Sequence, residues 1–186
     1  EKANHYFKEL KSLYEKKEFI FGYTALLDGY LRSQNFQEAK ELLTEMKNER
    51  IDFDKVTVNV VSSNIIALVQ NGNVEKASEF HEIAKHSMKS SPNIFTSLIS
   101  GHSKSGNFEK ANHYFKELKS LYEKKDFIFG YNALLDGYLR SQKFQEAKEL
   151  LTEMKNERID FDKVTVNVVS SNIIALVQNG NVEKAS

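Results

Sequence analysis

The side chains of this sequence that could do chemistry are mostly short polar groups, and none has the spacing of a catalytic site. His81, Glu82 and His86 come close to a helical zinc site, but one extra residue rotates the second histidine by about 100° from the first. No Gly-rich phosphate loop, nucleophile elbow or carboxylate cluster occurs in the sequence. We therefore expect no enzyme, and no bound metal, cofactor or small-molecule substrate.

Composition narrows the remaining function classes. The 186 residues balance 26 Lys and Arg against 26 Asp and Glu, so net charge supplies no bulk attraction to nucleic acid. The chain has no Cys, which excludes disulfides and thiolate zinc clusters. No apolar run approaches the roughly 18 residues that a membrane-spanning helix requires. We expect no membrane partner.

The elements that position any polar site come from an internal duplication. Residues 1–78 return as residues 109–186, at an offset of 108, with three differences: Glu18 against Asp126, Thr24 against Asn132, and Asn35 against Lys143. A shorter period of about 36 residues lies inside this unit. It is visible in the alanines that follow short turns, at positions 3, 39, 77, 111, 147 and 185. Such periods predict a repeat array.

Each short repeat predicts two amphipathic helices. Apolar residues recur at i, i+3, i+4 and i+7 from Tyr23 to Tyr30, and a second stripe runs from Phe36 to Met46 after a break. One helix pair alone cannot bury both stripes, whereas stacked pairs can. Glycines inside the first helices, at Gly29, Gly101 and Gly137, predict close helix approach.

The pattern along these repeats resembles the pentatricopeptide repeat. The residues that carry the resemblance are Tyr23–Tyr30, Phe36–Ala39, Leu42–Lys47, Ile51 and Asp54, and again Phe95–Gly101 with Ser105–Ala111. The absence of Trp separates the chain from tetratricopeptide repeats. The resemblance implies an all-α, right-handed α-solenoid of stacked two-helix repeats of about 35–36 residues. We expect one solenoid fragment over 1–186, with a half repeat at 1–19, repeats at 20–54, 55–91, 92–127 and 128–162, and a partial repeat at 163–186.

Proteins of this family bind single-stranded RNA, so the resemblance implies recognition of one base per repeat by two residues. The first reader lies near the start of each first helix, and the second closes the repeat. By resemblance, Thr selects purines, Asn selects pyrimidines, and a closing Asp selects G or U. The implied pairs are Thr24 with Asp54 for G, Asn59 with Ser91 for a pyrimidine, Thr96 with Asp126 for G, Asn132 with Asp162 for U, and an unpaired Asn167.

Two of these assignments have alternatives. The repeat that starts at Lys55 has about three extra residues, so Ser62, and Ser170 in the second copy, compete with Asn59 and Asn167. We prefer Asn59, because Val58, Val61, Ile65 and Leu68 then form the buried stripe, whereas the other register buries Asn64. Phe127 competes with Asp126 as the closing residue of its repeat.

Two further sets complete the predicted interface. Phe21, Val56, Phe129 and Val164 precede the readers and are expected to stack on bases. Arg32, Lys104 and Arg140 end the first helices, where the family places a cation that faces phosphate. These residues also have structural interpretations. Thr24 and Asn132 could be N-cap or first-turn residues, and Asp54 and Asp162 could cap the next helix. The phenylalanines could be core residues, and the cations could complement the helix dipole.

The reader position is one of the three at which the two copies differ, which indicates that the copies select different bases. We expect a sequence-specific single-stranded RNA-binding protein, acting as an adaptor or as a subunit of a ribonucleoprotein with other proteins. By resemblance alone it belongs in mitochondria or plastids. The alternative is a protein–protein interaction scaffold that uses the concave face of the solenoid, which the zero net charge favours.

Overall fold

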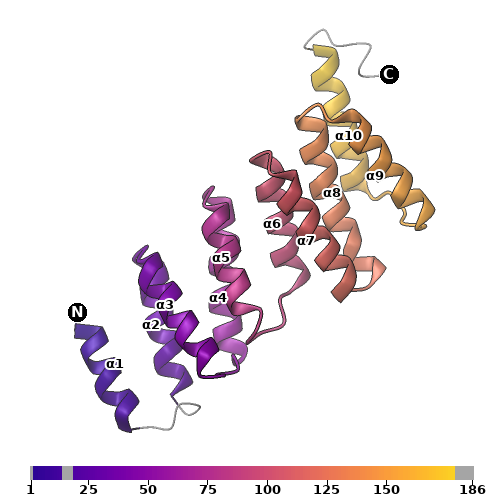
Figure 1. Cartoon of the computed structure of the whole chain (residues 1–186). Helices are drawn as coiled ribbons and strands as arrows, with labels where there is room; N and C mark the ends of the chain where they lie inside the picture. Colours follow the sequence, from indigo (N-terminus) through magenta and orange to yellow (C-terminus); the bar gives the residue numbers. More distant parts are fainter. Residues whose placement is uncertain (1, 14–18, 179–186) are drawn as a thin grey trace. The chain divides into compact units, whose positions relative to one another are not determined.

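The computed structural model describes residues 2–13 and 19–178, and every regular element within them is an α-helix (Figure 1). Two compact units divide the chain at residues 1–91 and 92–186. The first contains α1 (Lys2–Leu13), α2 (Ile20–Arg32), α3 (Phe36–Asn48), α4 (Lys55–Gln70) and α5 (Val74–Ala84). The second contains α6 (Pro92–Lys104), α7 (Phe108–Leu121), α8 (Lys124–Arg140), α9 (Phe144–Asn156) and α10 (Lys163–Gln178). Among the described residues, no helix is both long and apolar enough to cross a bilayer.

Within each unit the helices pair in chain order and the pairs stack on one another. In the first unit α2 packs on α3 and α4 on α5, while α2 also contacts α4 and α3 contacts α5. In the second unit α6 packs on α7 and α8 on α9, and α8 contacts both α6 and α10. First helices therefore line up beside first helices. The predicted all-α stack of two-helix repeats is confirmed.

The turn inside each helix pair is closed by a residue with a left-handed backbone. After α2, Gln34 has φ 59°, and the Asn35 amide donates to the Tyr30 carbonyl at 2.9 Å. Gly72 and Gly106 hold the same position in the next two pairs, with φ of 79° and 78°. This geometry satisfies carbonyls at the helix end and reverses the chain in three residues.

The predicted apolar stripes supply the core of each unit. In α2, Tyr23 and Leu27 are fully buried, and in α3 the buried residues are Ala39, Leu42, Leu43 and Met46. Tyr131 repeats the burial of Tyr23 in the second unit. Because each stripe is covered by the adjoining pair, the opposite face of a first helix is left to carry polar and exposed side chains.

The expected close approach at helix glycines holds for one glycine and not for its copy. A Cβ built on Gly137 of α8 would lie 2.3 Å from the Ser103 Cβ of α6. The equivalent Gly29 has no such neighbour within 4 Å. The glycine is thus required in the second unit, where a preceding first helix packs against it.

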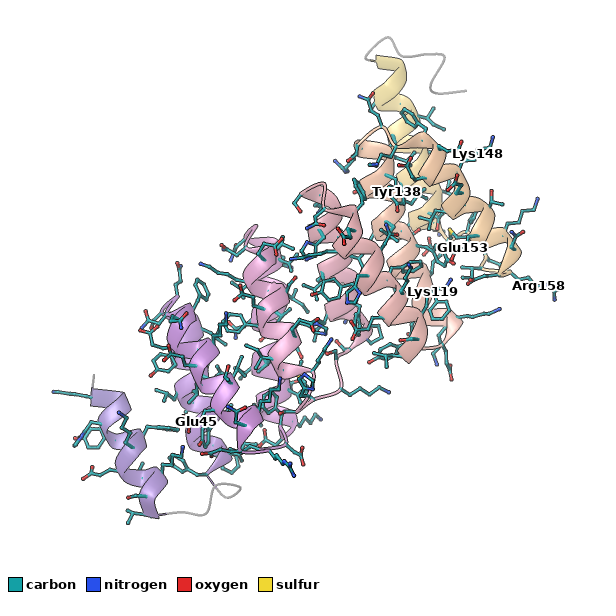
Figure 2. All side chains as sticks on the ribbon, viewed as in Figure 1. Glu45, Lys119, Tyr138, Lys148, Glu153 and Arg158 are labelled. Carbon is teal, nitrogen blue, oxygen red and sulfur yellow. The ribbon has the colours of Figure 1, made fainter. Side chains whose placement is uncertain are left out.

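A cluster of charged groups ties three successive helices together in each unit. Lys119 of α7 donates to Glu153 of α9 at 2.7 Å, and both residues are labelled in Figure 2. Lys119 also donates to Glu157 of α9 at 2.5 Å and to the Tyr131 hydroxyl of α8 at 3.1 Å. Burial raises the pKa of Tyr131, so its hydroxyl remains protonated and donates to Glu153 at 2.9 Å. The first unit has the same cluster, formed by Lys11, Tyr23, Glu45 and Glu49. These lysines are occupied by neighbouring repeats, so other cations must serve any anionic ligand.

Candidate functional site

The predicted readers Thr24 and Asp54 meet at the start of α4. Asp54 is the N-cap of this helix, and its Oδ1 accepts from the Thr57 amide at 2.8 Å and the Thr57 hydroxyl at 2.7 Å. The Thr57 hydroxyl lies 2.6 Å from that of Thr24, which also donates to the Ile20 carbonyl at 2.9 Å. Thr57, which is fully buried, therefore bridges the two readers.

Asn132 and Asp162 meet in the same way at the start of α10, and here the two readers touch directly. The Asn132 amide nitrogen donates to Asp162 Oδ1 at 3.2 Å. Thr165 donates from its amide to Asp162 Oδ1 at 2.7 Å, and its hydroxyl lies 2.7 Å from Asn132 Oδ1 and 2.9 Å from Asp162 Oδ1. The two units thus build one site with different first readers.

Both aspartates are held as carboxylates. The amide and hydroxyl of Thr57 lower the pKa of Asp54. The pKa of Asp162 is lowered mainly by the Thr165 amide, with smaller contributions from the Thr165 hydroxyl and Asn132. An ionised carboxylate can only accept hydrogen bonds. Each site therefore presents an obligate acceptor next to a reader of variable chemistry.

The structural interpretation holds for the aspartates and fails for the first readers. Asp54 and Asp162 do cap α4 and α10. The N-cap interpretation of the first readers is wrong, because Thr24 and Asn132 lie inside α2 and α8 rather than at their starts. They are only 7% and 6% exposed, so a ligand can reach a small part of each side chain.

The predicted readers on α4 and α10 are arranged differently. Asn59 is exposed on α4, and no hydrogen bond joins it to Ser91 among the described residues. Its rival Ser62 lies almost a turn further along and is half-buried. The buried residues of α4 are Thr57, Val61, Ile65 and Leu68, while Val58 and Asn64 are half-buried. Asn167 and Ser170 are both exposed on α10.

The third repeat departs most from the expected geometry. Thr96 is half-buried and donates to the Pro92 carbonyl at 3.0 Å. Helix α8 begins at Lys124, ahead of the expected repeat boundary, so Asp126 lies in its first turn and not at its N-cap. The competing Phe127 is buried in the core. The described structure gives no hydrogen bond between Thr96 and Asp126.

Four exposed apolar side chains accompany the readers. Phe21, Val56, Phe129 and Val164 are 71%, 53%, 51% and 51% exposed. The core interpretation of the two phenylalanines is therefore wrong. Asn93 stands at this position in the third repeat and is also exposed. Large apolar groups that recur in solvent at one repeat position are typical of a binding surface.

The three predicted cations lie in the last turns of α2, α6 and α8, where they also complement the helix dipoles. Arg32 Nε donates to Asp28 at 2.7 Å, and Arg140 Nε donates to both oxygens of Asp136 at 2.8 Å. Lys104 is exposed on α6. Each arginine keeps further N–H donors in solvent, but its charge is partly balanced by the neighbouring aspartate.

Sequence reasoning missed Thr57 and Thr165, which join the two members of each reader pair. The available signal was the spacing Asp-x-x-Thr, in which an N-cap aspartate accepts from the residue three positions later. That spacing predicts the bond to Asp54 or Asp162. It does not predict the contact with Thr24 or Asn132, which lie more than 30 positions earlier in the chain.

Comparison with known proteins identifies the family of the repeats. Residues 20–64 and 128–173 match the model of the PPR repeat family, and residues 94–122 match the PPR repeat model. A pentatricopeptide repeat-containing protein of Arabidopsis thaliana is 32% identical over 199 residues, covering 88% of this chain and 39% of the relative. A chloroplastic and a mitochondrial Arabidopsis protein of the same description are each 27% identical over 150 residues, covering 80% of this chain and 17% and 16% of theirs.

A solved structure has the same fold. The crystal structure of the pentatricopeptide repeat protein PPR10 from maize matches with a TM-score of 0.62 at 18% identity, covering 96% of this chain and 26% of that chain. At this identity the likeness concerns the fold. The chain spans less than half the length of each of these relatives.

Proposed function

Since the chain belongs to the pentatricopeptide repeat family, we propose that it binds single-stranded RNA in a sequence-specific manner, with one base per repeat. The observation that carries the proposal is the pairing of Thr24 with Asp54 and of Asn132 with Asp162 at equivalent points of two repeats. The first reader of each pair lies on a first helix that also carries an exposed aromatic ring, Phe21 or Phe129.

The carboxylates account for a preference between bases. On the Watson–Crick edge, the ring nitrogens of G and U carry a hydrogen, whereas those of A and C are acceptors. An ionised Asp54 or Asp162 can accept from G or U and repels the acceptor nitrogen of A or C. A closing aspartate therefore favours G and U.

The first readers separate purine from pyrimidine. Asn132 keeps one amide hydrogen after its bond to Asp162, and this hydrogen can donate to a carbonyl oxygen of U. The Thr24 side chain is shorter than that of asparagine and carries a single hydroxyl, so it leaves more room for the larger ring of a purine. The rings of Phe21 and Phe129 would stack on a neighbouring base and add about 1–3 kcal/mol per base without regard to its identity.

The proposed location and cellular role rest on the similarity to the relatives. Two of them are described as chloroplastic and mitochondrial, so we place this protein in an organelle, as an RNA-binding adaptor or a ribonucleoprotein subunit with other proteins as partners. The described residues supply binding groups rather than a nucleophile, and occupancy of an RNA segment is the activity they support.

One observation favours a second candidate, a protein-binding scaffold of the same fold. Arg32 and Arg140 are paired with Asp28 and Asp136, which reduces the positive potential that an RNA backbone would meet. Salt dependence separates the two functions. RNA binding through phosphates loses affinity steeply as salt rises, with a slope of about −0.7 per phosphate contact on single strands.

The decisive test is an exchange of readers, measured by fluorescence anisotropy with short single-stranded RNAs. Oligonucleotides would carry G, pyrimidine, G and U in the order of the repeats, with single changes at the first and last positions. Thr24→Asn should move the preference of its repeat from G toward U, and Asn132→Thr should do the reverse, by about 5- to 100-fold per reader. Thr44→Asn is the matched control, because Thr44 is an exposed threonine on a second helix that also donates to the carbonyl four residues earlier. Absence of RNA binding at low salt, or a preference that ignores the exchange, would contradict the proposal.

A further inference from the structure

We infer that the buried threonines Thr57 and Thr165 are positioning residues for base selection, because each fixes the hydrogen-bonding group that its reader turns toward the base. The inference rests on the proposed RNA-binding function and adds a third residue to each reading site. Both threonines are fully buried, so neither can touch a base itself. They act through Thr24 and Asn132.

In the first unit, the two hydroxyls supply two hydrogens for three short contacts, which are Thr57 with Asp54 Oδ1, Thr24 with Thr57, and Thr24 with the Ile20 carbonyl. The Thr57 hydroxyl lies 2.7 Å from Asp54 Oδ1, which is an acceptor, so Thr57 donates to Asp54. With that hydrogen used, Thr24 donates across the contact of 2.6 Å to Thr57; with the Thr57 hydrogen turned to Thr24 instead, Thr24 donates to the Ile20 carbonyl. The other acceptor close to Thr24 is the Ile20 carbonyl, which also faces inward. In either case the Thr24 hydrogen is consumed inside the protein.

Thr24 is consequently left with lone pairs to present to a ligand. Together with Asp54 it forms a site of two acceptors, which matches the ring N–H and amino group of G and mismatches the acceptor nitrogen of A. Without Thr57, the Thr24 hydrogen would keep one acceptor, the Ile20 carbonyl, and would turn outward to donate to A more readily. The buried hydroxyl therefore helps to exclude the wrong purine.

In the second unit, Thr165 holds the amide of Asn132 at its oxygen. The Thr165 hydroxyl is 2.7 Å from Asn132 Oδ1, while the Asn132 nitrogen faces Asp162 Oδ1 at 3.2 Å. Reversal of the amide would set two acceptors against each other at the carboxylate. Without Thr165, the single contact of 3.2 Å would hold the reader, and its second N–H would lose its fixed direction. This direction distinguishes the edges of U and C.

Comparison of the two copies supports a common role. Thr57 and Thr165 occupy identical positions in the duplication, as do Asp54 and Asp162, while the reader changes from Thr24 to Asn132. The same hydroxyl meets a threonine hydroxyl in one site, where either oxygen can donate, and donates to an amide oxygen in the other. A hydroxyl can do both, which an aliphatic side chain of the same shape cannot.

The test measures base preference in the full chain after Thr57→Val and Thr165→Val, with anisotropy as above. Thr57→Val is expected to reduce the G-over-A ratio of affinities at its repeat. Thr165→Val is expected to reduce the U-over-C ratio by about fivefold, the effect of one lost hydrogen bond. The change for Thr57→Val should be the smaller, because Thr24 keeps the Ile20 carbonyl as an acceptor. Thr57→Ser and Thr165→Ser, which restore the hydroxyl, should restore the ratios.

Two controls separate positioning from folding. Thr44→Val and Thr152→Val remove equivalent hydroxyls from exposed sites on α3 and α9 and should leave both ratios unchanged. Partial unfolding lowers the active fraction equally for every base, so it does not alter a ratio. Where a valine variant fails to fold, the alanine variant, compared with the serine variant, gives the same ratio test.

Each outcome is informative. A reduced ratio that serine restores supports the inference. An unchanged ratio, or equal loss of affinity for both bases, overturns it and leaves Thr57 and Thr165 as helix-cap residues. If the parent chain binds no RNA at low salt, the proposed function itself fails and the inference fails with it. Binding with base preference in the parent but unaltered preference in the variants refutes the inference alone.

Discussion

Phe129 and Phe127 lie two residues apart on α8, and their replacement by alanine should affect different properties. Phe129→Ala should change RNA affinity, and Phe127→Ala should change folding stability. Phe129 is 51% exposed, whereas Phe127 is 6% exposed and lies under the ammonium group of Lys119, 5.8 Å from its ring centre. We expect Phe129→Ala to weaken RNA binding with little loss of stability. Phe127→Ala should destabilise the fold and leave the affinity of the folded protein unchanged.

The magnitudes follow from the exposed fractions. Full burial of a phenylalanine contributes about 1.5–3 kcal/mol, so Phe129, about half of which is already in solvent, should contribute on the order of 1 kcal/mol to folding. Its loss as a stacking platform should cost about 1–3 kcal/mol of binding, or about 5- to 150-fold in Kd. Removal of the buried Phe127 ring should cost about 3–5 kcal/mol of unfolding free energy, because it leaves a cavity.

The assay pairs urea unfolding, followed by circular dichroism, with RNA anisotropy titrations on the same preparations. The reasoning is refuted if Phe129→Ala lowers the unfolding free energy as much as Phe127→Ala does. It is also refuted if Phe129→Ala binds RNA as tightly as the parent. Phe21→Ala, at the equivalent and still more exposed position, should repeat the result for Phe129→Ala.

Three further predictions concern packing, charge and pH. Gly137→Ala should lower the unfolding free energy by about 1–3 kcal/mol, because the added Cβ would lie 2.3 Å from a side chain of α6. Gly29→Ala has open space around the added Cβ, so it should raise the unfolding free energy by about 1 kcal/mol in the same urea assay. Arg140→Gln should reduce the salt slope of RNA binding by about 0.7, and Asp136→Asn, which releases that arginine, should tighten binding in anisotropy titrations at low salt. The pKa of Asp54 is lowered in the folded state. The ionised Asp54 therefore stabilises the fold at pH values above 3.8, the ordinary pKa of an aspartate, and this stabilisation is lost as pH falls through the folded-state pKa. Asp54→Asn should flatten the acid limb of a curve of unfolding free energy against pH.

Local pattern was sufficient to predict the fold. The stripe from Tyr23 to Leu27 and the stripe from Ala39 to Met46 are buried, because a helix with one apolar face has to cover it with a neighbouring helix. The turn at Gln34 was also visible as a polar break, although its left-handed backbone follows from the end of the helix and not from the residue type.

Helix starts were less predictable, and this affected the predicted readers. The stretch before α8 contains no residue that forces a boundary, and α8 extends back to Lys124, with no side-chain cap hydrogen bond at Glu123. Asp126 therefore lies inside the helix and Phe127 joins the core, whereas Asp54 caps α4 as a closing residue was expected to do. Boundaries of this kind depend on packing against neighbouring helices, which a periodic pattern does not encode.

The role of Thr57 and Thr165 illustrates the same limit at the site. Spacing along one helix identifies the bond between a cap and the third residue after it. The second partner of each threonine comes from another first helix, and its distance depends on how closely two repeats stack. Sequence reasoning therefore paired Thr24 with Asp54 and Asn132 with Asp162, while the hydroxyl that joins the members of each pair became apparent in three dimensions.

The duplication works as a comparison made within one chain. The two reading sites have the same closing aspartate, the same buried threonine and the same exposed ring, and they differ in the first reader. A purely structural position would tolerate this exchange by losing or gaining a hydrogen bond, but Thr24 and Asn132 both bond to the equivalent buried threonine of an unchanged framework. A framework that accepts either reader without other changes lets the base preference of a repeat vary while its packing stays constant. This separation of selectivity from stability is what the proposed recognition of one base per repeat requires.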